Sequence, residues 1–478
     1  MPATPQEISL AFICVVLVHL VGAAHAVHAM MNVRTSQGTI AWMLFLLGFP
    51  YLGVPLYWFL GRSRFQGYIR ARRFGDRTLR QTARHMRASL DGSRVEANEG
   101  FLRAITKLAE VPITSGNRYD LLIDGEETFR ALFRAIEAAE DYVLACFFIV
   151  KNDRIGTRFQ QALIRKARQG VRVRLIFDEM GSFSLPRSYL RELREAGVEC
   201  HSFGATRHWW SRFQLNFRNH RKVLIADGKI GFLGGLNVGD EYIDGGSGWS
   251  DWRDTHIALE GPAVQVLQLI FIEDWHWAAG GVLDKLNWTP QQVPGPHANV
   301  VILPTGPADE QDSWLLFVIL AANKAKHRLW IASPYFVPDN GCLAVLQSAA
   351  MRGVDVRILL PERADHLLVW LSGFSYYEET IPFGIRLFRY QQGFMHQKTV
   401  LIDDTDAVIS SANLDNRSFR LNFEISAILP DRRAAAEVAA MLEKDFAACR
   451  EVFVGEITKR SFFFRALTRA ARLMAPVQ

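Results

Sequence analysis

Two short segments of the chain carry the same three side chains that could take part in chemistry. Each segment has a histidine, a lysine two residues later and an asparagine 15 residues after the lysine. The first set is His220, Lys222 and Asn237, and the second is His396, Lys398 and Asn413. A lone histidine–lysine pair is a common accident, but a second copy with the same asparagine at a constant offset of 176 residues is not.

These side chains suit the transfer of a phosphodiester. A neutral imidazole can attack phosphorus, and a second imidazole, when protonated, can give its proton to the leaving alkoxide. Two lysines and two asparagines can hold the non-bridging oxygens while negative charge builds up on them. The set requires no metal and no other cofactor, and the sequence shows no cluster of carboxylates with the spacing of metal ligands.

The residues around each set predict the elements that position it. His220 and Lys222 project from the same face of a strand because they are two residues apart. Four apolar residues follow Lys222 and predict a buried strand, and Asp227-Gly228 predicts a hairpin turn. The returning strand then brings residues 234–237 back beside His220, so that one imidazole, one ammonium and one amide converge in each copy.

The rest of the chain predicts an α/β fold of two similar halves. In each half an amphipathic helix precedes an apolar strand, and a second helix precedes an alternating strand. The helices and strands fall at residues 126–139, 142–150 and 171–177 in the first half and at 315–322, 329–337 and 354–360 in the second. This order predicts two α/β sandwich lobes related by a pseudo-twofold axis, with one site at their interface.

Two apolar runs, residues 8–31 and 39–60, precede the lobes. Each exceeds the ~20 residues that a helix needs to cross a bilayer, so they predict a transmembrane hairpin in which Pro50, Gly53 and Pro55 are tolerated. The first run lacks the basic start of a cleaved signal peptide. Nine arginines and one acid lie between residues 62 and 87, and this excess places the lobes in the cytoplasm.

Three histidines in the first run, His19, His25 and His28, raise the alternative of a metal or haem site. No carboxylate accompanies them, so we expect them at the membrane interface or in the contact between the two helices.

Charge and cysteine content narrow the class of partner. The net charge is +6, which fits either nucleic acid or an acidic membrane surface, and two membrane spans favour the membrane. The five cysteines are scattered with no CxxC pair, which predicts reduced thiols rather than disulfides or a zinc ribbon.

The repeated segments resemble the HKD motif of the phospholipase D superfamily, HxKxxxxD followed by GSxN. Five further segments are similar to the bacterial cardiolipin synthases of that superfamily, as is the N-terminal hairpin. These segments are residues 216–224, 234–242, 252–256, 333–339 and 413–418. The likeness covers essentially the whole chain. It implies an enzyme of the bacterial inner membrane that transfers a phosphatidyl group between phosphatidylglycerol molecules, without a cofactor and without a nucleic-acid partner.

The resemblance also implies roles for single residues. His220 corresponds to the nucleophile that forms a phosphohistidine, and His396 to the residue that acts as acid and then as base. Asp254 and Glu424 correspond to the acidic residues that orient the two imidazoles, although ordinary surface carboxylates are the alternative. Lys222 and Lys398 complete the two motifs.

The remaining motif positions are Asp227, Asp403 and Ser411. Asp227 and Asp403 correspond to the aspartates of the catalytic motif, but their place at the turns indicates a structural role. Ser411 keeps the hydroxyl of GSxN and could bind phosphate, whereas Gly235 replaces that serine in the first copy.

Two segments outside the motifs are expected to meet lipid. A loop before the first motif holds Arg207, His208, Trp209, Trp210, Arg212 and Phe213. The C-terminal tail alternates basic residues with phenylalanine and leucine, which predicts an amphipathic segment on an anionic membrane. Packing of the loop against the other lobe, and docking of the tail as a surface helix, are the alternatives.

These observations predict five parts and leave three functions open. The parts are a transmembrane hairpin (1–61), a basic juxtamembrane linker (62–117), a first lobe (118–290), a second lobe (291–457) and a basic tail (458–478). Phosphatidyl transfer is the leading function. The same histidines would hydrolyse phospholipid or nucleic acid if water were the acceptor, and a non-catalytic membrane scaffold conflicts with two intact motifs.

Overall fold

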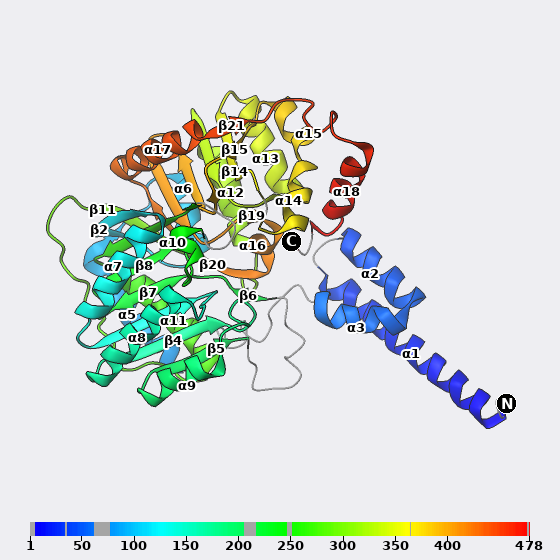
Figure 1. Cartoon of the computed structure of the whole chain (residues 1–478), viewed down its shortest axis with the longest axis horizontal. Coiled ribbons are helices and arrows are strands. Elements are labelled where there is room, and N and C mark those ends of the chain that lie inside the picture. The colour runs from blue at the N-terminus through cyan, green and yellow to red at the C-terminus, as the bar shows by residue number, and fades with distance from the viewer. Residues whose placement is uncertain are drawn as a thin grey trace.

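The protein is described by a computed structural model that covers residues 5–33, 36–61, 77–204, 217–245, 251–363, 365–475 and 478. Two α/β lobes form the body, and the N-terminal helices project from it as an arm (Figure 1). The predicted α/β class with two duplicated lobes is confirmed, and of the two expected transmembrane helices the described residues contain one that is long and apolar enough to cross a membrane.

The sheet of the first lobe has the strand order β5-β4-β3-β7-β8-β10-β2. Strands β3, β4 and β5 are parallel, and the remaining neighbours are antiparallel. The strands are β2 (Ile113–Ile123), β3 (Tyr142–Phe147), β4 (Arg172–Asp178), β5 (Glu199–Phe203), β7 (Val223–Ala226), β8 (Ile230–Gly234) and β10 (Thr255–Glu260).

The second lobe repeats this order as β15-β14-β12-β17-β18-β20-β11, with the same parallel and antiparallel pairs, and adds β21 outside β15. The strands are β11 (Ala298–Thr305), β12 (Arg328–Ala332), β14 (Asp355–Pro361), β15 (Arg386–Tyr390), β17 (Thr399–Ile402), β18 (Asp406–Ser410), β20 (Asn422–Leu429) and β21 (Cys449–Glu451). Each strand of the first order thus has its counterpart at the same place in the second.

Helices cover both sheets. Those of the first lobe are α7 (Asp124–Ala138), α8 (Arg154–Arg168), α9 (Arg187–Glu195), α10 (Glu241–Asp244) and α11 (Ala263–Ala279). Those of the second lobe are α12 (Ser313–Lys324), α13 (Asn340–Met351), α14 (Leu367–Phe374), α15 (Tyr377–Thr380), η3 (Ile381–Phe383), α16 (Asn416–Arg420) and α17 (Arg432–Ala447). Helix α11 is apolar on nearly all sides because it is buried against strands of both lobes, including β5, β10 and β11.

Short parallel pairs join the lobes next to the repeated motifs. Strand β6 (Arg218–Asn219) pairs with the start of β20, and β16 (Phe394–Met395) pairs with β9 (Trp252–Arg253). Strand β13 (Phe336–Val337) pairs with β19 (Leu414–Asp415) within the second lobe. Each reactive histidine comes one residue after an interlobe strand, so the contact between the lobes fixes its position.

The segment expected as a juxtamembrane linker is folded in its described part. It contains α5 (Arg77–Ser89), η1 (Asp91–Ser93), β1 (Arg94–Val95) and α6 (Gly100–Ala109). Helix α5 packs on α11, and α6 packs on β11 and α12. Its apolar side chains, such as Leu90 and Ile105, are fully buried in the main core, so this segment belongs to the body of the protein. Most of its expected basic residues, 62–76, lie outside the described residues.

The N-terminal arm consists of α1 (Pro5–Asn32), α2 (Ser36–Gly48) and α3 (Pro50–Leu60). Within the described residues, α1 is the one helix long and apolar enough to cross a membrane, over Ala11–Asn32. The second apolar run differs from the expected single helix, because it breaks at Phe49 before Pro50. Proline lacks an N–H and disfavours helical geometry in the residue before it, so α3 begins anew there.

The histidines of α1 lie in the contact between the helices of the arm. The His28 Nδ1 atom lies 2.9 Å from the Tyr57 hydroxyl, and the Trp58 indole donates to His25 Nε2 at 2.7 Å. Gly22 permits the close approach, since a Cβ there would lie 2.5 Å from the backbone oxygen of Leu46.

The C-terminal tail forms α18 (Phe462–Arg472), which docks on α14. Phe464, Thr468 and Ala471 recur at helical spacing and face the body. The opposite side leaves Phe462 and Phe463 71% and 82% exposed.

Candidate active site

A cavity of about 580 Å³ opens between the two lobes, and the histidine and asparagine of each repeated set line it, whereas Lys222 and Lys398 are not among its lining residues. His220 and Asn237 of the first lobe line it together with His396 and Asn413 of the second. The other lining side chains include Phe148, Lys151, Arg218, Glu241, Tyr242, Trp252, Tyr335, Asp365, His366, Asp415, Arg417 and Asn422. The structure therefore brings both histidines and both asparagines of the predicted set to one site.

The imidazole of His220 is held by a carboxylate of the second lobe. Its Nδ1 lies 2.9 Å from each carboxylate oxygen of Glu424. Glu424 is fully buried and also accepts hydrogen bonds from Ser411 (2.6 Å), Ser418 (3.0 Å) and Asn422 (3.2 Å). With Nδ1 donating to this carboxylate, Nε2 is the ring nitrogen available to a substrate.

The imidazole of His396 is held in the same way by the first lobe. Its Nδ1 lies 2.8 Å from Oδ2 of the fully buried Asp254, whose Oδ1 accepts the backbone N–H of Thr255 at 2.8 Å. Asp254 comes directly after β9, and Glu424 directly follows the two residues of β20 that pair with β6. Each orienting carboxylate is therefore the next residue after a pairing between the lobes.

Backbone hydrogen bonds reinforce this crossed arrangement. The N–H of His220 donates to the carbonyl of Phe423 at 2.9 Å, and the N–H of His396 donates to the carbonyl of Arg253 at 2.8 Å. In both cases the acceptor is the residue just before the orienting carboxylate. The side chain of Arg253 is anchored in turn by Asp445, at 2.7 and 2.8 Å. The backbone therefore sets the position of each histidine and its carboxylate together.

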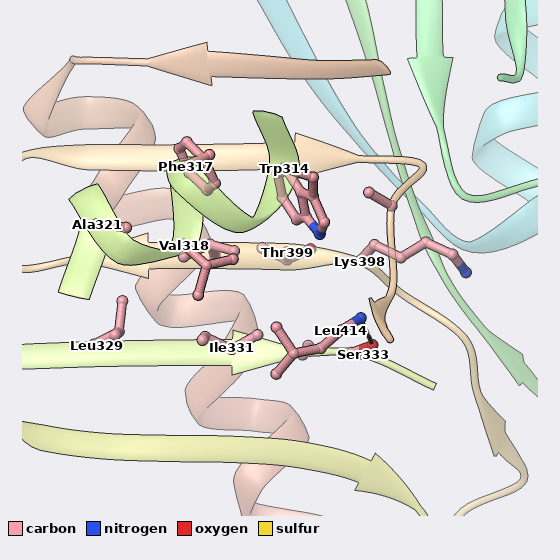
Figure 2. Close-up of a pocket in the computed structure, with 13 residues that line it drawn as sticks. Trp314, Phe317, Val318, Ala321, Leu329, Ile331, Ser333, Lys398, Thr399 and Leu414 are labelled. Carbon is pink, nitrogen blue, oxygen red and sulfur yellow. Dashed lines mark hydrogen bonds between the residues drawn. The ribbon is translucent and has the colours of Figure 1, made fainter. Parts of the chain in front are cut away.

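The two motif lysines are buried beside the histidines. Lys222 Nζ donates to the carbonyl of His220 at 2.5 Å. Lys398 Nζ donates to the carbonyl of His396 and lies 2.9 and 3.1 Å from the two ring nitrogens. Behind Lys398, apolar side chains of α12, β12 and β17 fill the space, and its ammonium points away from them (Figure 2). This packing directs the positive charge toward the site.

Burial sets the protonation of the histidines. It lowers the pKa of His220 to about 4 against the opposing charge of Glu424. It also lowers the pKa of His396 to about 4, and the charge of Lys398 acts in the same direction. Both imidazoles are therefore neutral at pH 7 in the free enzyme, which is the nucleophilic form. A phosphate anion bound between them would favour the protonated form of one of them.

The lysines and carboxylates of the site also have shifted pKa values. Burial lowers the pKa of Lys222 to about 7 and that of Lys398 to about 8. Burial alone would raise the pKa of Asp254 and Glu424, but the neighbouring lysines and histidines outweigh it and hold both values below the usual range. The orienting groups are thus carboxylates at neutral pH.

The two asparagines are fixed by their neighbours. Asn237 accepts the N–H of Ile149 at 3.1 Å and donates to the Tyr242 hydroxyl at 2.8 Å. The backbone oxygen of Asn413 accepts the indole N–H of Trp314 at 2.9 Å. Within the described residues, the buried Oδ1 of Asn413 has no hydrogen-bond partner. This oxygen can only accept a hydrogen bond, so a phosphate oxygen would be held by the Nδ2 group of Asn413, which donates to Asp415 at 3.3 Å.

Ser411 has a different place from the one expected. Its hydroxyl donates to Glu424 and accepts the N–H of Ile425 at 3.0 Å, and it does not line the cavity. The equivalent position of the first lobe is Gly235, where a Cβ would lie 2.0 Å from Oδ1 of Asp254. The serine therefore supports one carboxylate, and the glycine leaves room for the other.

Asp227 and Asp403 are not brought into the site. Both have positive φ angles, 53° and 50°, at the hairpin turns. Asp227 accepts the backbone N–H groups of residues 140, 141 and 142 at 2.8–2.9 Å. Asp403 accepts the N–H groups of residues 326–328 in the same manner. Each aspartate ties a turn to the start of its central strand, in keeping with the structural role inferred from its position.

Sequence reasoning missed several residues of the cavity. Arg218 precedes the first motif by two residues, and Arg417 and Asn422 follow the second. Arg218 and His220 share the i, i+2 spacing that places side chains on one face of an extended strand, and this spacing could have revealed it. The expected aromatic and basic loop, with Arg207, His208, Trp209, Trp210, Arg212 and Phe213, lies outside the described residues. Among the described residues, no group of three or more histidine, cysteine, aspartate or glutamate side chains could hold a metal ion.

Comparison with known proteins agrees with this geometry. A family model described as "Cardiolipin synthase, PLD-like domain" matches residues 132–275 and 318–448, and one described as "Phospholipase_D-nuclease N-terminal" matches residues 10–62. The solved phosphatidylserine synthase of Haemophilus influenzae Rd KW20 shares the fold, with a TM-score of 0.59 over 80% of this chain and 100% of that chain, at 13% identity. Fold and site define a two-lobe enzyme of the phospholipase D superfamily.

The curated relatives narrow the family further. Cardiolipin synthase A of Pseudomonas putida (strain W619) is 44% identical over 466 residues, which are 96% of this chain and 97% of the relative. Cardiolipin synthase A of Pseudomonas aeruginosa (strain LESB58) is 44% identical over 467 residues, which are 96% and 94% of the two chains. The chain belongs to the cardiolipin synthase family.

Proposed function

We propose that the protein makes cardiolipin by moving a phosphatidyl group from one phosphatidylglycerol to another, with release of glycerol. The observation that carries this proposal is the pair of neutral histidines at one cavity, each held through Nδ1 by a buried carboxylate of the opposite lobe. One histidine can attack while the other moves a proton, as a double displacement at phosphorus requires.

In the first step, Nε2 of His220 attacks the phosphorus of the donor lipid. The bond from phosphorus to the glycerol oxygen breaks, and His396, protonated beside the bound phosphate, gives its proton to the departing alkoxide. Lys222, Lys398, Asn237 and Asn413 hold the non-bridging oxygens. Glu424 stabilises the positive charge that develops on the imidazole of His220, because its carboxylate accepts a hydrogen bond from the Nδ1–H group.

In the second step, His396 is neutral and acts as a base. It takes the proton of a glycerol hydroxyl on a second phosphatidylglycerol, and the oxygen attacks the phosphohistidine. The bond between nitrogen and phosphorus breaks, and cardiolipin forms with His220 neutral again. One diester replaces another, so the reaction needs no nucleotide and no cofactor.

Membrane attachment is part of the proposal. The apolar helix over Ala11–Asn32 and the lipid substrates of the family support an enzyme that works at a membrane. We place it in the bacterial inner membrane with its lobes in the cytoplasm, because arginines crowd the sequence after the arm. The exposed phenylalanines and the basic residues of α18 suit the surface of a bilayer rich in anionic lipid.

A product assay tests this function. The purified full-length enzyme is placed in vesicles that contain labelled phosphatidylglycerol, with and without phosphatidylethanolamine. Cardiolipin and free glycerol without phosphatidylethanolamine are the expected products. Cardiolipin that forms only with phosphatidylethanolamine present would change the substrate pair, and phosphatidic acid alone would show that water is the acceptor and overturn the proposal.

A trapping experiment tests the division of labour. His396→Asn is mixed with phosphatidylglycerol labelled at phosphorus and quenched in alkali, in which phosphohistidine survives. Label on His220 is expected. Without His396 as acid the phosphohistidine forms slowly, and without His396 as base it is not passed on to an acceptor, so it accumulates. Label on His396 in the matched His220→Asn variant would reverse the two roles.

A further inference from the structure

The reaction proposed above joins two phospholipids, and each carries its own phosphate. The histidine, lysine and asparagine side chains form one phosphate site, which the donor lipid occupies during attack. The accepting lipid must place its glycerol hydroxyl against the phosphohistidine while its own phosphate stays in the same cavity, one glycerol headgroup away. A second group of cations near the histidines would offset this second negative charge.

Two arginines of the cavity are placed for that role. Arg218 belongs to β6 and lies two residues before His220, so that both side chains project from one face of the strand. Arg417 comes from α16 of the second lobe, four residues after Asn413. Neither arginine is repeated in the other lobe, because the matching positions, 176 residues away, hold Phe394 and Glu241. The two guanidinium groups thus make one half of the pseudo-symmetric cavity more basic than the other.

The electrostatics of the two arginines fit an anion-binding site. Burial lowers the pKa of Arg417, and the charge of Arg218 lowers it further, so the two cations are close enough to repel each other. Burial likewise lowers the pKa of Arg218. The charge of Asp178 raises the pKa of both arginines, and the charges of Asp415 and Glu424 also raise that of Arg417. The oxygens of Asp178 accept the N–H groups of Met180, Gly181 and Asn219 at 2.9–3.0 Å. A phosphate between the arginines would relieve their repulsion.

A third side chain suits the glycerol headgroup. Asn422 is the partner of Arg218 in the register between β6 and β20, and it lines the cavity. Its Nδ2 donates to Glu424 at 3.2 Å. Asn422 is 6% exposed, and its Oδ1 is without a hydrogen-bond partner among the residues that the structure describes. A buried amide oxygen in this state can accept a hydrogen bond from a glycerol hydroxyl.

We propose that Arg218 and Arg417 bind the phosphate of the accepting phospholipid, and that Asn422 binds its glycerol headgroup. The lysine sites hold the phosphate that reacts, and the arginine site holds the phosphate that does not. This assignment rests on the proposed function. It distinguishes the side of the cavity that binds the accepting lipid from the side at which the phosphate reacts. The accepting lipid enters past the arginines, and its hydroxyl points toward His220.

The test compares two acceptors for the same phosphohistidine. Labelled glycerol is a neutral acceptor and gives exchange of the phosphatidylglycerol headgroup, whereas a second phosphatidylglycerol is an anionic acceptor and gives cardiolipin. Full-length Arg218→Gln and Arg417→Gln are assayed for both reactions in the same vesicles. We expect the ratio of cardiolipin formation to glycerol exchange to fall about tenfold or more in each, because only the anionic acceptor uses the arginines.

The control is Arg154→Gln, which makes the same change at a residue outside the cavity that pairs with Asp240 and Asp244. Its ratio should equal that of the wild type. Thermal melting of all variants separates loss of the fold from loss of binding. Arg218→Lys and Arg417→Lys, which keep the positive charge, should recover part of the ratio of cardiolipin formation to glycerol exchange. Equal loss of both reactions, or an unchanged ratio, would overturn the assignment. Failure of the proposed function is distinct, since the wild type itself would then exchange glycerol without making cardiolipin.

Discussion

Glu424 of the second lobe holds His220 of the first through two contacts of 2.9 Å, and Asp254 of the first lobe holds His396 of the second at 2.8 Å. Each half of the duplicated chain therefore supplies a histidine to the other half's carboxylate. Neither imidazole takes its orienting carboxylate from its own lobe.

Removing the charge of Glu424 tests this crossed contact. Glu424→Gln keeps the size of the side chain but cannot stabilise an imidazolium at His220, so the rate of cardiolipin formation should fall by about 10²–10⁴-fold. The matched control is Glu437→Gln, where the glutamate is an exposed partner of Arg433. Retention of the full rate by Glu424→Gln would show that the carboxylate has no part in the reaction.

The difference between Gly235 and Ser411 gives a second prediction. A serine at position 235 meets Oδ1 of Asp254, so Gly235→Ser should displace Asp254 from His396, slow the reaction about 100-fold and destabilise the fold by about 1–3 kcal/mol. Ser411→Gly removes one hydrogen bond to Glu424 and should cost less in rate.

Steady-state rates and thermal melting measure both effects. Gly281→Ser is the control for the added side chain, because a Cβ at Gly281 meets no atom within 4 Å. A larger loss in Ser411→Gly than in Gly235→Ser would contradict this account of the asymmetry.

The lowered pKa values of the two histidines predict how stability depends on pH. Between about pH 6.5 and pH 4 the unfolded chain binds protons at His220 and His396 that the folded enzyme does not bind. The free energy of unfolding must then fall as the pH falls through this window. Below it, the lowered pKa values of Asp254 and Glu424 extend the loss in the same direction.

Melting temperatures in detergent from pH 7 to pH 4.5 measure this slope. The double variant His220→Asn/His396→Asn should show a shallower slope than the wild type, whereas His297→Asn, at an exposed histidine, should keep the slope of the wild type. Identical slopes in all three proteins would assign the acid sensitivity to other groups.

The exposed face of α18 predicts that this helix raises the activity of the enzyme on lipid bilayers. Phe462→Ser/Phe463→Ser removes two exposed rings. Burial of each ring in lipid would stabilise the membrane-bound state by about 1.5–3 kcal/mol. Activity on vesicles should fall severalfold relative to activity in mixed micelles, where the substrate is presented without a flat surface.

Phe183→Ser is the matched control, because Phe183 is 82% exposed but belongs to the first lobe. If its ratio of vesicle to micelle activity falls as far as that of the α18 variant, the effect is not specific to α18.

Local pattern predicted the repeated succession of helices and strands along the chain, because strand and helix periodicity act within each half. The hairpin turns and the constant offset between the halves predicted that both motifs meet at one site. The partner of each histidine could not be predicted in the same way. The contact of Glu424 with His220 depends on how two lobes pack, across 204 residues of sequence. Pro50 shows another limit, since a composition long enough to span a bilayer does not reveal that the helix breaks at Phe49.

Because each carboxylate holds the histidine of the other half, the two halves of one chain complete each other's site as two subunits of a dimer would. A half-length protein with one motif would place its carboxylate where only a second copy could use it, so its activity would fade on dilution. Fusion of the halves in one chain makes the crossed contacts independent of protein concentration. It also frees the halves to diverge, and the glycine–aspartate pair on one side and the serine–glutamate pair on the other are the trace of that freedom.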